Sequence, residues 1–156
     1  MILATHALVG AAIGKNINNP WVIIALSLVF HFTMDSFRHG EYFDDRVATL
    51  KTTWWKVALD LISGLLIILF AIYLQKPNII QTRNILLGAF SSMFPDLLTV
   101  LYWKFHFKFL EKIKKFHAFC HRYDRFPKYG KERQWTLRNA FNDLLFSLIA
   151  IILLFI

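Results

Sequence analysis

The sequence predicts an all-α integral membrane protein. Of its 156 residues, 56% are hydrophobic and 17% are aromatic, and several apolar stretches are as long as a membrane is thick. A composition this apolar is unusual for a soluble domain of the same length. We expect a single domain over residues 1–156, built as a compact bundle of four full transmembrane helices, with a short N-terminal helix and an amphipathic surface helix.

Four stretches match the roughly 20 residues that a helix needs to cross about 30 Å of hydrocarbon. They are residues 20–37, 57–74, 85–103 and 137–156. The opening segment, residues 1–14, is apolar but only about 20 Å long as a helix, so we expect it to be short or half-inserted. It shows neither a basic start nor a small-residue cleavage site, and we therefore do not expect a removable signal peptide.

Positive charge gathers in one loop. The chain has a net charge of +8, and residues 104–135 contain ten Lys or Arg against three acidic residues. By the positive-inside rule this loop is cytoplasmic, which places the protein in the cytoplasmic (inner) membrane. Residues 104–121 predict an amphipathic helix on the membrane surface, with anionic lipid headgroups as partners. No nucleic-acid partner is expected, and the single Cys120 excludes both an intrachain disulfide and a four-cysteine zinc site.

The candidate site begins with His31 and Asp35, four residues apart in a nearly uncharged run. On a helix this spacing puts both side chains on one face, where they can share a metal ion or a proton. Ionisable groups in a membrane are costly unless they are paired, coordinated or facing a wet cavity. Three further spans contribute one buried acid each, namely Asp60, Asp96 and Asp143.

With the basic loop inside, the predicted topology gathers these groups in the cytoplasmic half of the bundle. We expect one or two divalent ions, Zn²⁺ preferred and Mn²⁺ or Fe²⁺ possible, because imidazole and carboxylate suit these metals. The predicted ligands are His6, His31, Asp35, Asp60 and Asp96. His117 and His121 form a second pair four residues apart and are possible additional ligands.

Simpler roles stay open for several of these residues. An intramembrane Asp can pair with a basic or polar neighbour, His6 can cap or pack at a helix start, and Asp143 can favour the first turn of its own helix. His117 and His121 can also serve the membrane interface. For His39 and His106 we expect solvent or lipid.

Two short motifs resemble a known family. Thr5-His6-Ala7-Leu8-Val9-Gly10 is similar to a Thr-His-x-x-x-Gly start, and Phe94-Pro95-Asp96-Leu97 to a Pro-Asp-Leu element. Both are typical of the membrane-bound, metal-dependent hydrolases represented by a LexA-regulated bacterial inner-membrane protein. The resemblance implies a multi-span helical protein with a metal site at the cytoplasmic edge, acting on a phosphoester such as that of a lipid.

The functional hypothesis is therefore a metal-dependent phosphoester hydrolase. A bound ion would lower the pKa of a water molecule and steady the leaving oxygen, while Asp35 or Asp60 acts as the catalytic group that handles the proton. The expected phosphate or lipid contacts are Arg122, Arg125 and Lys128. The alternative is a proton or metal-cation transporter that uses the same buried His and Asp residues.

Overall fold

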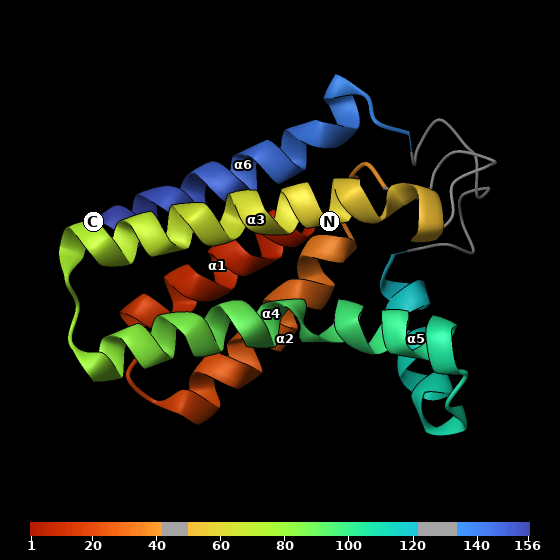
Figure 1. Cartoon of the computed structure of the whole chain (residues 1–156), viewed down its shortest axis with the longest axis horizontal. Helices are drawn as coiled ribbons and strands as arrows, with labels where there is room; N and C mark the ends of the chain where they lie inside the picture. The colour runs from red at the N-terminus through yellow and green to blue at the C-terminus, as the bar shows by residue number, and fades with distance from the viewer. Residues whose placement is uncertain (42–49, 122–133) are drawn as a thin grey trace.

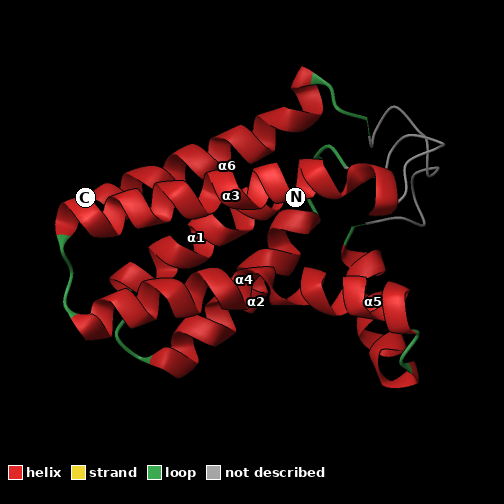
Figure 2. Ribbon diagram, in the orientation of Figure 1, coloured by secondary structure: helices red, strands yellow, loops and turns green. Residues whose placement is uncertain are grey.

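The structure is a computed structural model that describes residues 1–41, 50–121 and 134–156. These residues form helices and connecting loops, with no β-strand among them, which confirms the predicted all-α class. Figure 1 shows a bundle whose long helices run side by side, with α5 at one end. Figure 2 shows the short loops that join α1 to α2 and α3 to α4 at the opposite end.

Helix α1 (Leu3–Asn16) is the element around which the others pack. It contacts α2, α3, α4 and α6, and most of its residues are buried. Its Ala and Gly residues let neighbouring backbones come close, which is how helices associate where no water drives them together. The predicted short N-terminal helix is thus present, enclosed by the rest of the bundle.

Helix α2 (Pro20–Asp35) begins at a strong start signal. The Asn19 side chain accepts hydrogen bonds from the backbone N–H groups of Trp21 and Val22 at 3.0 and 3.4 Å, and Pro20 occupies the first helical position, where no N–H is needed. With 16 residues the helix is about 24 Å long, which is shorter than a ~30 Å hydrocarbon core. The prediction of a fourth full span over residues 20–37 is therefore not confirmed.

Helices α3 (Leu50–Gln75), α4 (Ile79–Phe105) and α6 (Leu137–Phe155) are each long and apolar enough to cross a membrane. Helix α3 shows this most clearly, because it exposes large apolar side chains along its length, among them Leu59, Leu66, Phe70 and Tyr73. Such a surface is favourable against lipid and unfavourable against water. Among the described residues, three helices therefore have the character of membrane spans.

Several helix boundaries differ from the prediction, and α4 for example begins at Ile79, six residues earlier than expected. Helix α3 begins seven residues earlier than expected, at Leu50. Helix α4 continues to Phe105 and ends because His106 adopts a left-handed conformation with φ of 54°. The surface helix is accordingly shorter than residues 104–121: a 3-10 turn (Lys108–Leu110) leads into α5 (Glu111–Cys120).

Helices α1 and α4 meet backbone to backbone at two glycines. A Cβ added to Gly88 would lie 2.0 Å from the carbonyl oxygen of Gly10. We expect Gly88→Ala to force the helices apart and to lower the free energy of unfolding by about 1–3 kcal/mol, the usual cost of overpacking. Thermal unfolding in detergent measures this, with Leu86→Ala on the exposed face of α4 as the control. A melting temperature unchanged by Gly88→Ala would contradict the close contact.

Candidate metal centre

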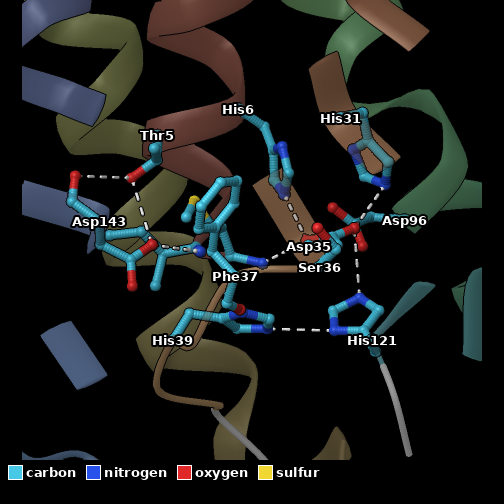
Figure 3. Close-up of polar contacts among 12 residues, drawn as sticks. Thr5, His6, His31, Asp35, Ser36, Phe37, His39, Asp96, His121 and Asp143 are labelled. Carbon is cyan, nitrogen blue, oxygen red and sulfur yellow. Dashed lines mark hydrogen bonds and ion pairs between the residues drawn. The ribbon is translucent and has the colours of Figure 1, made fainter. Parts of the chain in front are cut away.

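Ionisable side chains from five segments meet beside the start of α1. The group, hereafter the His/Asp cluster, consists of His6 from α1, His31 and Asp35 from α2, His39 from the following loop, Asp96 from α4, His117 from α5 and His121 just after it. They fall into four overlapping sets of three, and within each set the candidate ligand atoms lie within 4.8 Å of one another. Figure 3 shows six of these side chains pointing toward one another from different segments: His6, His31, Asp35, His39, Asp96 and His121.

Asp35 is the centre of the cluster. Its Oδ1 lies 3.1 Å from Nε2 of His6. Its Oδ2 lies 3.0 Å from Nε2 of His31, 3.1 Å from Nε2 of His117 and 3.3 Å from Nε2 of His121. The carboxylate is fully buried, and a buried charge needs compensating partners. The N-terminal ammonium group of Met1, which forms an ion pair with Oδ1, and four imidazoles supply them.

The contact between His31 and Asp35 follows from their spacing on α2. The two residues are four positions apart and share one face, as predicted. The helix ends directly after Asp35, and Ser36 bonds back to the carbonyl groups of the last turn. Both side chains therefore lie at the end of α2, beside the start of α1.

Pro95 shapes the α4 side of the cluster. Proline has no N–H, so the carbonyl of Ser91, four residues earlier, lacks its helical bond next to the carbonyl of Ser92. The carbonyl oxygen of Ser92 accepts a hydrogen bond from Nδ1 of His31 at 2.6 Å. Asp96 follows Pro95, with Oδ1 3.5 Å from Nε2 of His117. Its Oδ2 is buried and has no hydrogen-bond partner within the described part of the chain.

In His31 and His117, the contact made by Nδ1 determines that Nε2 faces the cluster. For His31, Nδ1 donates to the carbonyl of Ser92. For His117, Nδ1 lies 2.7 Å from the hydroxyl of Thr99, which donates to a carbonyl of its own helix and is therefore the acceptor. In the neutral form of each ring, these partners place the proton on Nδ1. The Nε2 lone pairs of His31 and His117 then face each other across 3.2 Å.

His39 orients His121 in the same way. Its Nδ1 lies 2.8 Å from the carbonyl of Phe37, and its Nε2 lies 3.1 Å from Nδ1 of His121. Because His39 donates to the carbonyl, its Nε2 accepts from His121, whose own Nε2 is turned into the cluster, 3.0 Å from that of His117. Burial is the main reason that the pKa values of His39 and His121 lie below the ordinary value. Both rings are therefore neutral at neutral pH.

This arrangement can hold a metal ion. Lone pairs of imidazole nitrogen and carboxylate oxygen that face one another at close range repel unless a cation lies between them. Two atoms that bind the same zinc ion at about 2.0–2.1 Å are about 3.0–3.4 Å apart for common coordination angles. The distances from 3.0 to 3.3 Å among His31, His117, His121 and Asp35 fall within that range. Outer partners that fix the ligating nitrogen are typical of metal-binding histidines.

Asp60, predicted as a ligand and as a catalytic residue, is placed elsewhere. Its Oδ2 accepts a hydrogen bond from the backbone N–H of Ala4 at 3.1 Å, and Asp143 accepts one from Ile2 at 3.1 Å. The first N–H groups of a helix have no intrahelical partner, and the helix dipole favours anions there. Asp60 thus caps α1 and is not one of the clustered ligand groups among the described residues. Figure 3 shows Asp143 in a separate network with Thr5.

The expectation for His39 is wrong. We expected solvent or lipid around this side chain, but it is only 6% exposed and belongs to the cluster. His39 lies beyond the end of α2, so its spacing from His31 and Asp35 gave no helical signal. The other predicted residues that the structure brings together are His6, His31, Asp35, Asp96, His117 and His121. The predicted phosphate contacts Arg122, Arg125 and Lys128 lie outside the described residues.

A cavity of about 250 Å³ adjoins the cluster. His39, Asp96, His117 and His121 line it on one side, together with Thr99. The remaining walls are mainly apolar and include Leu3, Trp54, Val57, Val100 and Trp103, with Lys114 as a basic group. A few convergent polar groups within an apolar cavity are the usual features of a ligand site. Glu41 also lines the cavity as an acidic group, so the cavity suits a molecule with one polar and one apolar part.

Comparison of the chain with protein-family models, with curated proteins and with solved structures finds no match.

Proposed function

We propose that this protein is a membrane-embedded, metal-dependent hydrolase that cleaves a phosphoester of a lipid. One observation carries the proposal: the buried His/Asp cluster, with ligand atoms 3.0–3.3 Å apart, directly lines a largely apolar cavity. The resemblance of the Thr5-to-Gly10 and Pro95-to-Leu97 segments to membrane-bound metal-dependent hydrolases supports the same reaction class.

The chemistry needs a divalent ion, and the donor set favours Zn²⁺. Imidazole-rich sites suit zinc, with Mn²⁺ and Fe²⁺ as alternatives. When bound, the ion lowers the pKa of a water molecule and polarises the phosphoryl oxygen. His31, His117 and His121 hold the ion, and Asp35 supplies the negative charge that their neutral rings lack.

Asp96 is best placed to accept the proton from the attacking water. It lines the cavity, its side chain is 24% exposed, and its Oδ2 has no hydrogen-bond partner within the described residues. A general base must reach the substrate side of a site, whereas Asp35 is surrounded by imidazoles and Asp60 caps α1. We therefore assign to Asp96 the proton-accepting role that the sequence suggested for Asp35 or Asp60.

The surroundings of the cluster support a lipid as the substrate. Helix α5 carries exposed Phe116 and Phe119, and Phe109 in the preceding 3-10 turn is also exposed. Lysines lie on the same segment, so it suits the interface between hydrocarbon and anionic headgroups. The cavity next to α5 gives a headgroup phosphate access to the cluster while the chains stay in an apolar environment. We place this edge at the cytoplasmic side of the inner membrane because of the basic loop.

Lys114 is the candidate phosphate contact among the described residues. It lines the cavity together with His117 and His121. We expect Lys114→Ala to raise KM for an anionic lipid about tenfold with little change in kcat, because a charge-assisted hydrogen bond contributes about 1.5 kcal/mol or more to binding. Lys112→Ala removes the same charge from the exposed side of α5 and is the matched control. Equal KM values for the two variants would contradict the contact.

The experiment that tests the function is a hydrolysis assay on the detergent-purified protein. Mixed phospholipids and polyprenyl phosphates are supplied with Zn²⁺ or Mn²⁺, and released phosphate or headgroup is measured by mass spectrometry. We expect metal-dependent turnover that Asp96→Asn abolishes. Metal-loaded protein that cleaves none of these esters would contradict the proposal.

Transport through the bundle is less well supported. A proton or cation pathway needs polar groups on both sides of the cluster. Beyond the cluster, the described core between α1, α3, α4 and α6 is apolar and includes Ala7, Leu8, Ala11, Ile68 and Leu154. Metal-dependent ion flux in liposomes without any hydrolysis would favour transport over hydrolysis as the function.

A further inference from the structure

We propose that the His/Asp cluster is a two-metal centre in which the two oxygens of Asp35 bridge the ions. This inference rests on the proposal that the cluster binds metal, and it adds the number of ions and the ligands of each.

The cluster contains more ligand atoms than one ion can use. Nε2 of His39 is occupied by its contact with His121. The Nε2 atoms of four other imidazoles and the four oxygens of Asp35 and Asp96 remain. Zinc takes about four ligands in a tetrahedral protein site. A single ion would leave half of these donor atoms without a metal, and the N-terminal ammonium group of Met1 pairs with one of them, Oδ1 of Asp35.

The donors divide into two sets because the two oxygens of Asp35 face different imidazoles. Oδ2 lies 3.0–3.3 Å from the Nε2 atoms of His31, His117 and His121. Within that set, Nε2 of His117 is 3.2 Å from that of His31 and 3.0 Å from that of His121. We assign these three imidazoles and Oδ2 of Asp35 to one ion and name this group site 1.

Site 2 lies on the other side of the carboxylate. Oδ1 of Asp35 faces Nε2 of His6 at 3.1 Å and also pairs with the N-terminal ammonium group of Met1, which a metal ion at this site would displace. Asp96 belongs with His6 and His31 in one set of ligand atoms within 4.8 Å of one another, and its Oδ2 is buried without a hydrogen-bond partner in the described chain. Site 2 therefore has His6, one oxygen of Asp96 and Oδ1 of Asp35 as ligands, and the other oxygen of Asp96 keeps the proton-accepting role. With three protein ligands it keeps a position for water or a phosphate oxygen, as catalytic sites do.

The packing of His6 on His31 supports two separate ions. The rings are stacked, with centroids 4.2 Å apart and an interplanar angle of 30°. Their Nε2 atoms thus project side by side toward the two oxygens of one carboxylate. Ions in two-metal hydrolases lie about 3.5–4 Å apart, where they hold the attacking and leaving oxygens. A phosphoester is the substrate class for which such a pair is suited.

The test uses Mn²⁺, which reports on a neighbouring ion through its electron paramagnetic resonance spectrum. The detergent-purified full-length protein is stripped of metal and titrated with Mn²⁺ alone, and bound metal is counted by mass spectrometry. We expect two ions per chain and the spectrum of an exchange-coupled pair. His6→Gln, which keeps the side-chain volume, is expected to bind one ion and to give an uncoupled spectrum. Asp96→Asn provides a second variant of site 2, and exposed His106→Asn serves as the control that keeps both ions.

Uptake of one ion with an uncoupled spectrum by the unaltered protein would overturn the two-metal centre. A coupled spectrum that persists in both His6→Gln and Asp96→Asn would also overturn it. Circular dichroism checks that both variants are folded. These results are independent of the hydrolase proposal. Two coupled ions without any phosphoester turnover would leave this inference standing and remove the proposed function, whereas one ion with turnover would do the reverse.

Discussion

We expect Asp35→Asn to lower metal affinity more than 100-fold and to abolish hydrolysis. The substitution removes the charge that four imidazole nitrogens approach within 3.0–3.3 Å. Changing only an outer partner of a metal ligand already costs about 10- to 100-fold in affinity or activity, so loss of the central carboxylate costs more. Metal titration of the purified variant by calorimetry, followed by the lipid assay, measures both effects.

Asp60→Asn is the matched control for this change. It also neutralises a carboxylate near the start of α1, but the Asn side chain can still accept the hydrogen bond from Ala4. We expect metal content and turnover close to those of the unaltered protein. If the two variants lost metal equally, the central position of Asp35 and the capping role of Asp60 would both be contradicted.

We expect removal of metal to loosen the packing of α5 against the bundle. His117 and His121 are two of the contacts that hold this short helix against α2 and α4. Without a cation their nitrogen lone pairs face other acceptors across about 3 Å, and the repulsion favours release of the helix. Cys120, the one cysteine of the sequence, is half-buried between them on α5 and reports this movement. We expect a chelator to raise its rate of modification by a maleimide severalfold, and added Zn²⁺ to restore the slow rate.

Two variants separate this effect from a general loosening of the protein. His121→Ala is expected to react rapidly without chelator, because its contact with Asp35 is lost. His106→Asn, which leaves the cluster intact, is expected to react slowly until metal is removed. A modification rate that chelation leaves unchanged would mean that metal does not hold α5 in place.

Hydropathy predicted much of the fold because the lipid-facing helices need long apolar stretches. It was less informative for α1 and α2, which are enclosed by or packed against protein and need not match the thickness of the membrane. It also could not locate the end of α4, since this depends on the left-handed conformation of one residue, His106.

The sequence predicted those site residues that lie close to one another along the chain. His31 and Asp35 share a helix face, as do His117 and His121, and both pairs could be recognised from a separation of four residues. Asp60 illustrates the limit of this reasoning. A buried carboxylate can bind a cation or cap a helix, and only the position of α1 decides between these roles. His39 was missed because it follows the end of α2, where helical periodicity no longer applies.

The most direct test of a metal centre is the metal content of the detergent-purified protein, compared with that of His31→Ala and His106→Asn. His31 binds through Nε2 beside Asp35 and is fixed by the carbonyl of Ser92, whereas His106 is exposed and lies outside the cluster. We predict stoichiometric zinc or another divalent metal in the unaltered protein and in His106→Asn, and a loss of at least half of it in His31→Ala. Unaltered protein that retains no metal after purification and takes up none when supplied with Zn²⁺, Mn²⁺ or Fe²⁺ would contradict the account.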